Sequence, residues 1–255
     1  MQEEHNKLKA GIPVCDILGV HIAAIDMDWL LDFTQKHIKE LSGDYMCVSN
    51  VHTTVTAYHD PSYRNIQNNA IMAIPDGGPL SSQGRKRGFL DMKRVTGPSY
   101  LKEILTMSEK YGYRHFFYGS TKETTDTMLD NIRKQYPYIK IVGVYNPPFR
   151  SLTDEEDKQI TQLINSAEPD FVWVGLGAPK QEIWMADHQY KVKGFMVGVG
   201  AAFDYLAGNI KRAPEWMQKA NLEWFYRLCQ DPKRLFKRYF ITNTDFIWNA
   251  VIKGR

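Results

Sequence analysis

The sequence predicts an α/β fold: a Rossmann-like parallel sheet with helices on both faces, followed by a basic, aromatic helical C-terminal appendage. Two observations predict it. Short apolar segments alternate with helical segments between residues 45 and 199, at the spacing of strand–helix–strand units. From residue 211 onward the alternation is replaced by helical patterns rich in Lys, Arg and aromatic residues. We therefore divide the 255 residues into an α/β core, 1–210, and a helical appendage, 211–255.

Turn residues and apolar patterning define the elements before residue 112. Gly19 lies among β-branched residues, which is typical of a short hairpin. Ser42–Asp44 stops the first helix, and Pro75–Pro79 ends a short strand. Segment 81–96 is polar and basic, so we expect a surface or lid region there. The expected elements are a hairpin at 14–25, a helix at 28–41, a strand at 45–49, a helix opened by 50–54, a strand at 71–74 and a helix at 98–111.

Strands and helices alternate more regularly after residue 112. The clearest local signal is a capping box, in which Thr153 caps a helix and Glu156 lies three residues further on. From Pro214 onward the pattern is helical, with a break near Asp231–Pro232. The expected elements are strands at 115–118, 139–144, 171–175 and 195–199, and helices at 121–136, 153–167 and 179–190.

The composition limits the class of protein. With 255 residues, 43% of them hydrophobic, the chain can form a large core. Cys15, Cys47 and Cys229 are far apart and lack metal-ligand spacing, so we expect a reducing compartment, no disulfide and no zinc site. The polar N-terminus does not resemble a secretory signal. No run of about 18 apolar residues could span a membrane.

The charge distribution separates the appendage from the core. The net charge is +3, but residues 211–255 hold ten Lys or Arg and four Asp or Glu, a net +6, which leaves −3 on residues 1–210. Nine aromatic residues are interleaved with these basic residues. This combination favours an anionic surface, such as lipid headgroups, a diphosphate or nucleic acid. A solvated basic helix is the simpler alternative.

The most informative stretch of the core is Phe171–Met185, FVWVGLGAPKQEIWM. A buried strand is followed by a tight turn at Gly177 and Pro179, and a helix then opens with Lys180 and Gln181. Free N–H groups at a helix start bind anions, whereas a lysine there opposes the helix dipole. A ligand-binding turn beyond the carboxyl end of a strand and a plain strand–turn–helix both fit these residues.

Five loops are expected beyond the carboxyl ends of strands. In a parallel sheet they lie at one edge, where their glycines, amides, hydroxyls and acids suit a nucleotide-linked ligand. The dinucleotide pattern G-x-G-x-x-G does not follow a first strand, and no phosphate-binding G-x-x-x-x-G-K-[ST] loop is present. The five loops are 50–54, 75–79, 119–121, 175–182 and 200–204.

Three side chains in these loops could carry chemistry. Asp76 is either a turn aspartate or a general base that takes a proton from an attacking hydroxyl. Asp204 either accepts hydrogen bonds from sugar hydroxyls or caps a helix. His52 could do similar work to Asp76, but a lone histidine in a helix is more often structural. Arg85–Arg87 is most simply a solvated surface.

The motifs PDGGP, VGLGAPKQEIW, VGVGAAFD, KRAPEW and LEWFYRLCQDPKRLFKRY occur in this order. Their combination resembles the WecG/TagA/CpsF family of bacterial glycosyltransferases, from about residue 45 to the end. The resemblance implies transfer of a sugar, often N-acetylmannosamine, from a UDP-sugar to an undecaprenyl-diphosphate-linked sugar at the cytoplasmic membrane face. It also implies inversion of the anomeric configuration without a metal or a cofactor.

The resemblance assigns roles to residues of the core. Asp76 matches the proposed base, Asn50 a cleft asparagine, and Gln181 the glutamine beside the leaving diphosphate. Family members often have Thr two residues before that asparagine. Here Val48 stands there, followed by Ser49, so either the donor sugar differs or Ser49 substitutes for the threonine.

Further residues are expected to contact the substrates. Asp204 matches a residue near the nucleotide, and the basic residues of the appendage match those proposed to meet the lipid diphosphate. Arg234 and Lys237 share a helix face by the three-to-four spacing, and Arg227 lies one helix earlier. The expected substrate-binding residues are Ser49, Gly177, Lys180, Asp204, Arg212, Arg227, Arg234 and Lys237.

The main hypothesis is an inverting, metal-independent glycosyltransferase of cell-surface polysaccharide synthesis, peripheral on the inner face of the cell membrane. Its expected partners are a UDP-sugar, a polyprenyl-diphosphate-linked acceptor and an anionic membrane, without nucleic acid; a homo-oligomer is left open. One alternative is a nucleotide-sugar epimerase or dehydrogenase, against which the missing dinucleotide pattern counts. Another is a non-enzymatic binder of anionic surfaces, which leaves the strand-end loops unexplained.

Overall fold

A computed structural model describes residues 2–254, apart from the side chains of Lys219 and Arg234. Its centre is an eight-stranded sheet with the order β1-β2-β4-β3-β8-β7-β5-β6. Every neighbouring pair is parallel except β1 and β2, which form the predicted hairpin. The strands are β1 (Val14–Ile17), β2 (Val20–Ala23), β3 (Tyr45–Ser49), β4 (Met72–Pro75), β5 (Arg114–Gly119), β6 (Lys140–Tyr145), β7 (Phe171–Gly175) and β8 (Phe195–Gly198).

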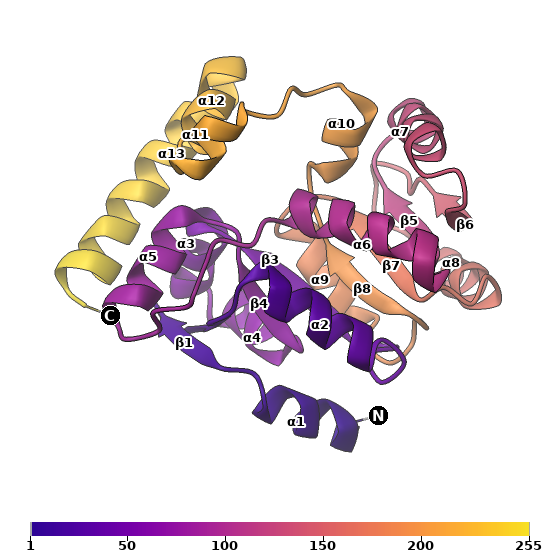
Figure 1. Cartoon of the computed structure of the whole chain (residues 1–255), viewed down its shortest axis with the longest axis horizontal. Coiled ribbons are helices and arrows are strands. Elements are labelled where there is room, and N and C mark those ends of the chain that lie inside the picture. The colour runs from indigo at the N-terminus through magenta and orange to yellow at the C-terminus, as the bar shows by residue number, and fades with distance from the viewer. Residues whose placement is uncertain (1, 255) are drawn as a thin grey trace.

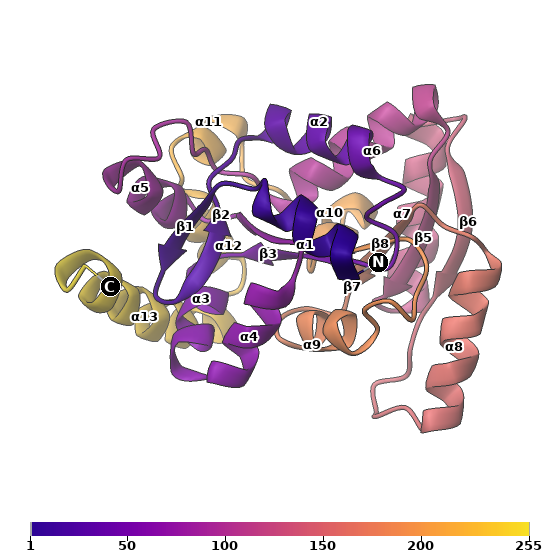
Figure 2. The ribbon, with the colours of Figure 1, turned by 90° about the horizontal axis from the view of Figure 1, so that it is seen from below.

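Helices cover both faces of this sheet (Figure 1). Figure 2 shows α2 and α6 above the sheet and α4 and α9 below it. On the first face lie α2 (Met27–His37), α6 (Gly97–Tyr111), α7 (Lys122–Gln135) and α10 (Ala202–Ala207). On the second face lie α3 (Val51–His59), α4 (Pro61–Asn69), α5 (Gly78–Lys86), α8 (Asp154–Ser166) and α9 (Lys180–Asp187).

Alternation along the central strands divides the core into two apolar layers. In β7, Phe171 and Trp173 pack with the helices of the first face, whereas Val172 and Val174 pack with those of the second. Successive side chains of a strand point to opposite faces, so a strand that is covered on both sides is apolar throughout. The predicted α/β class, with helices on both faces of a parallel sheet, is confirmed.

The appendage is helical, as predicted. It consists of α11 (Glu215–Lys219), α12 (Glu223–Gln230), α13 (Pro232–Phe246) and a π-helical end, η1 (Ile247–Ile252). Figure 1 shows α13 as the long yellow helix that runs past α3. Phe246 and Ala250 are buried among the residues of the second apolar layer, and His59 of α3 pairs with Asp245. The appendage therefore packs on the core; the domain boundary at residue 210 stays a prediction.

Several helices and one segment differ from the sequence prediction. Segment 81–96 is not simply a surface region, because its first part belongs to α5, where Ser81 and Gln83 are buried. The helices α1 (Gln2–Ala10), α4 and α10 were not predicted, because all three are short and α1 and α4 are mostly polar. Asp60 caps α4, and buried His5 of α1 bonds to Asp44. Local composition therefore concealed helices that tertiary contacts and a cap stabilise.

The helix after β7 begins one residue later than predicted and ends earlier. Pro179 is its N-cap residue rather than its first helical residue, and it follows a cis peptide bond after Ala178. The helix ends at Asp187, three residues before the predicted end at Tyr190. The carboxyl end of β7 is still followed directly by this helix, which is the arrangement that the stretch predicted.

Candidate active site

The loops after β3 and β4 lie side by side. Ser49 pairs with Pro75 at the ends of the two strands, and the Asp76 N–H donates to the Ser49 carbonyl at 2.8 Å. A Cβ atom on Gly77 would lie 3.7 Å from the Cα of Asn50, so the two backbones are in contact. The structure thus brings Asp76 and Asn50, two of the three predicted catalytic residues, to the same edge of the sheet.

Asp76 lies in an environment suited to a proton acceptor. Its side chain is 24% exposed. Burial raises the pKa of Asp76 to about 6, the Arg94 guanidinium opposes this rise, Glu223 adds to it, and Arg227 and Arg212 oppose it. A carboxylate with such a pKa is ionised at neutral pH and holds a proton more tightly than an ordinary aspartate. That is the property expected of a general base.

Arg94 is a site residue that the sequence reasoning missed. Its Nε donates to the Asp76 carbonyl at 2.7 Å, and its Nη2 lies 3.8 Å from the Asp76 carboxylate oxygen Oδ1. The same Nη2 lies 2.5 Å from Oε2 of Glu223 in α12. In the sequence, Arg94 belongs to the polar segment 81–96, where no motif separates it from its basic neighbours.

Two predicted basic residues reach the same cluster. Arg212 donates to the Ser99 hydroxyl at 2.7 Å and to the Thr96 hydroxyl at 3.2 Å. The Arg227 guanidinium carbon lies 5.9 Å from the ring centroid of Tyr205, a residue of α10 that was not predicted for the site. Arg212 and Arg227 both lower the pKa of Asp76 against the effect of burial. The appendage therefore contributes positive charge beside the candidate base.

A cavity of about 360 Å³ opens beside Arg94. Lys93, one of its lining residues, pairs with Asp26 at 2.9 Å. Hydroxyls of Ser81, Thr96 and Ser99 also belong to its wall. Such a lining suits an anion that can accept several hydrogen bonds, such as a diphosphate. The basic residues that line it are Arg85, Lys93, Arg94 and Arg212.

Gln181 joins the loops that follow β7 and β8. Its Oε1 accepts hydrogen bonds from the N–H groups of Gly177 at 3.2 Å and Gly200 at 3.1 Å, and its Nε2 donates to Glu182 at 2.8 Å. The residue is 4% exposed. In this arrangement Gln181 determines where the two loops lie, and contact of its side chain with a leaving group stays a prediction.

The remaining predicted residues near β7 and β8 are less closely surrounded by protein atoms than Gln181 is. Gly177 has a φ of +77°, and a Cβ atom there would meet nothing within 4 Å. Lys180 is exposed at the start of α9. Asp204 is half-buried in α10 and accepts a hydrogen bond from Asn209 at 3.3 Å. It does not cap its helix, because Ala201 is the N-cap residue of α10.

Other predicted residues lie away from this cluster or make structural contacts. Ser49 is 1% exposed and its hydroxyl donates to Gln67 of α4, so this placement gives no support to a substrate contact. Asn50 caps α3, accepting from the N–H groups of His52 and Thr53. Lys237 is exposed on α13. The side chain of Arg234 lies outside the described residues.

His52 lies in α3 near Arg238 of α13. Burial lowers the pKa of His52, and the Arg238 guanidinium of α13 lowers it further. Its Nδ1 is buried and has no hydrogen-bond partner. His52 is therefore a neutral residue where α3 packs against α13, which agrees with the structural alternative.

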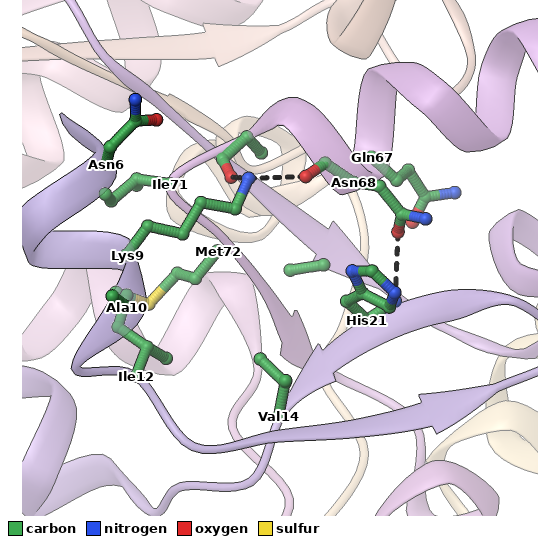
Figure 3. A pocket seen from close by; sticks show the side chains of 12 residues that line it. Asn6, Lys9, Ala10, Ile12, Val14, His21, Gln67, Asn68, Ile71 and Met72 are labelled. Atoms are coloured by element: carbon green, nitrogen blue, oxygen red, sulfur yellow. Dashed lines mark hydrogen bonds between the residues drawn. The ribbon is translucent and has the colours of Figure 1, made fainter. Parts of the chain in front are cut away.

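A second cavity, of about 330 Å³, lies under α1 and beside β2 (Figure 3). Two of its polar side chains, Lys9 and Asn68, are engaged in hydrogen bonds. Lys9 donates to the carbonyls of Asn68 and Ala70, and Asn68 accepts from the N–H of His21. It lacks the concentration of cations that lines the cavity beside Arg94, so we place the candidate site at the latter.

The described residues show neither a metal-binding cluster nor a membrane-spanning helix. Among residues 2–254, no three His, Cys, Asp or Glu side chains gather in a way that could hold a metal ion. In the same part of the chain, no helix is long and apolar enough to cross a membrane. Metal independence stays a prediction.

Comparisons with known proteins identify the family. The model of the glycosyl transferase WecG/TagA/CpsF family matches residues 15–255. A relative from Bacillus subtilis (strain 168) is 32% identical over 206 residues, which make up 80% of this chain and 78% of that protein. It is named N-acetylglucosaminyldiphosphoundecaprenol N-acetyl-beta-D-mannosaminyltransferase.

Two further relatives carry the same name. The protein from Bacillus spizizenii is 27% identical over 201 residues, 78% of this chain and 76% of that protein. The protein from Staphylococcus aureus (strain MW2) is 27% identical over 224 residues, 86% of each chain. The predicted resemblance and enzyme class are confirmed: the chain belongs to the WecG/TagA/CpsF family and is a glycosyltransferase.

Proposed function

We propose that this glycosyltransferase moves N-acetylmannosamine, or a related hexose, from a UDP-sugar to an undecaprenyl-diphosphate-linked N-acetylglucosamine in cell-surface polysaccharide synthesis. The acceptor and the sugar are those in the names of its relatives. The observation that carries the proposal is the position of Asp76, whose pKa burial raises to about 6, beside the cluster of Arg94, Arg212 and Arg227.

In the proposed mechanism, the acceptor hydroxyl attacks the anomeric carbon from the face opposite UDP. Asp76 takes the hydroxyl proton as the new glycosidic bond forms, the bond to UDP breaks, and UDP leaves with the electron pair. The configuration is therefore inverted. Charge grows on the departing diphosphate, and positioned cations stabilise such charge most effectively in a site with little water. Arg94, Arg212 and Arg227 are the side chains that we assign to this role, without a metal.

The acceptor is lipid-linked, and the appendage offers a surface that fits a membrane. Phe236 and Phe240 stack with ring centroids 6.2 Å apart and are 62% and 63% exposed. Trp248 is 54% exposed, with the Lys253 ammonium over its ring. Exposed aromatics beside lysines are typical of helices that lie at an anionic lipid interface. We propose that α13 rests on the inner face of the cell membrane.

The central experiment is a panel of UDP-sugars incubated with lipid-linked N-acetylglucosamine and other acceptors, with products read by mass spectrometry and the new linkage by NMR. The proposal expects an N-acetylmannosamine or related hexose product with inverted configuration, formed in the presence of EDTA. A product with retained configuration, or turnover that EDTA abolishes, would contradict the mechanism. Absence of transfer to every lipid-linked acceptor would contradict the substrate class.

Membrane association has its own prediction. Replacing Phe236 and Phe240 by Ser should weaken binding to vesicles of anionic phospholipid by roughly tenfold or more, because two apolar side chains no longer enter the interface. Vesicle cosedimentation measures the change. Phe149→Ser is the matched control, because Phe149 is a phenylalanine that is 91% exposed and lies outside the appendage. Equal vesicle binding by the double variant and the control would show that α13 is not the membrane surface.

A further inference from the structure

Glu223 is a buried carboxylate that the proposed mechanism leaves without a role. It is the first residue of α12 and is 7% exposed. Its Oε2 lies 2.5 Å from Arg94 Nη2, and its Oε1 lies 3.5 Å from Arg212 Nε. An acid buried among cations holds those cations in place, and here both cations lie at the candidate active site.

Arg94 connects this carboxylate to the candidate base. One nitrogen of its guanidinium, Nη2, contacts Glu223 and lies 3.8 Å from the Asp76 carboxylate. The other nitrogens donate to main-chain carbonyls, Nε to Asp76 at 2.7 Å and Nη1 to Gln218 of α11 at 3.3 Å. The guanidinium therefore lies between a core loop and the appendage, and the shorter ion pair is the one to the appendage.

Both acids compete for the same nitrogen. An arginine beside a carboxylate normally forms a close, often bidentate pair, which stabilises the ionised acid and makes it a poor base. At 3.8 Å, Arg94 and Asp76 do not form such a pair. The guanidinium forms its close contact with Glu223 instead.

We propose that Glu223 is a positioning residue: it draws the Arg94 guanidinium toward the appendage and leaves the Asp76 carboxylate free to accept the proton of the acceptor hydroxyl. The inference rests on the proposed function, since it takes Asp76 as the base. It gives the appendage a second role besides membrane contact, because α12 must be docked for Glu223 to hold Arg94.

The charges around Asp76 agree with this role. Arg94, Arg212 and Arg227 lower the pKa of Asp76, and Glu223 raises it, while Tyr205 of α10 is held neutral because burial raises its pKa to about 12. Removing the negative charge of Glu223 takes away a repulsion and also releases Arg94 toward Asp76. Both changes lower the pKa of Asp76.

The test compares Glu223→Gln with Glu223→Asp and with wild type. In Glu223→Gln, we expect the acidic limb of the kcat profile to move down by about one pH unit, the low end of the shift that a nearby charge produces. We also expect kcat on the plateau to fall severalfold, because the base is weaker. KM for the UDP-sugar should not rise, because removing a negative charge adds no repulsion toward the diphosphate. Glu223→Asp keeps the charge and should restore the acidic limb at least in part.

The control variant is Glu215→Gln, which removes one negative charge from an exposed position of α11. It should leave the acidic limb where wild type has it. An unmoved limb in Glu223→Gln, or the same movement in Glu215→Gln, would overturn the proposal. A merely structural role for Glu223 would change folded yield or KM without moving the limb.

A second measurement separates this inference from the proposed function. Carbon-13 NMR of labelled aspartate, with the Asp76 signal assigned by its loss in Asp76→Asn, follows the Asp76 carboxyl group directly. The titration should move to lower pH in Glu223→Gln. If Asp76→Asn kept full activity, the base assignment would fail while the NMR shift still tested the contact. If Asp76→Asn were inactive and the NMR titration unmoved in Glu223→Gln, only the positioning role would fail.

Discussion

The loops after β3 and β4 and the loops after β7 and β8 lie at the same edge of one sheet, but their polar groups are used differently. At β7 and β8, the Gln181 amide is bonded to two backbone N–H groups and to Glu182. At β4, the Asp76 carboxylate lies 3.8 Å from the Arg94 guanidinium and has a raised pKa. Saturated hydrogen bonds hold a shape, whereas an incompletely paired charge retains the capacity to react.

The comparison teaches that the stretch with the most distinctive motif is not the stretch that holds the candidate base. The stretch around Gln181 has the denser motif, yet its side chain is committed to holding the loops of the binding edge. Asp76 lies in an ordinary Pro-Asp-Gly turn, and the charged groups that act on its pKa come from a distant loop and from the appendage. We therefore expect a substitution of Asp76 to lower turnover and a substitution of Gln181 to lower stability.

The largest expected effect is on turnover at Asp76. Asp76→Asn keeps the shape but cannot take a proton, so we expect kcat to fall by roughly 10²- to 10⁴-fold. UDP binding, measured by calorimetry, should change little. Asp126→Asn, on the exposed face of α7, is the control and should behave as wild type. Full activity in Asp76→Asn would contradict the assignment of Asp76 as the general base.

The next effect is on stability at Gln181. Gln181→Ala leaves the N–H groups of Gly177 and Gly200 without their acceptor, so we expect the free energy of unfolding to fall by about 1–3 kcal/mol for each group that stays unpaired. Urea unfolding measures the change, and Gln159→Ala, at an exposed position of α8, is the control. Gln181→Ala with unchanged stability and lost turnover would instead favour a direct catalytic contact.

The smallest effect is the pH dependence of wild type. Because burial raises the pKa of Asp76 from 3.8 to about 6, kcat should fall as the pH drops below about 6, approaching tenfold for each further pH unit. The folded state binds this proton more tightly than the unfolded state does. Asp76 therefore makes the protein more stable below pH 4, and this contribution is lost as the pH rises to about 6. Asp76→Asn should lack that part of the pH dependence of stability, and an identical stability profile in wild type and Asp76→Asn would contradict the raised pKa.

Much of the core could be predicted because its signals are local. The hydrophobic segments at 45–49 and 171–175 became β3 and β7 with the predicted bounds, and the Thr153–Glu156 capping box is present. Helix α4 escaped prediction although Asp60 and Pro61 are a good N-terminal signal. Apart from Tyr63 and Ile66 its remaining residues are polar, and two apolar side chains in a nine-residue segment are too few to mark a helix.

The predicted residues that lie together at the candidate site follow strand ends, as Asp76 and Asn50 do, or belong to motifs of the basic appendage, as Arg212 and Arg227 do. Asp76 and Asn50 each follow a strand directly, and adjacent parallel strands bring such positions together, although Asn50 was assigned to the site by the family resemblance. Ser49 was expected in the cleft, but its side chain points to α4, since neighbouring positions of a strand face opposite sides. Arg94 and Glu223 were missed because contacts between residues 129 positions apart leave no periodic pattern in the sequence.

By itself, the sequence determined the α/β class, the helical and basic character of the appendage, and the family, because each depends on residue types at short spacing. Only the tertiary structure decided which cations stand beside Asp76, that Gln181 holds two loops, and that Glu223 of the appendage shares Arg94 with the candidate base. These features depend on where long-range packing places side chains, to within a few ångström. Electrostatic interaction changes steeply over such distances, and local sequence does not specify them.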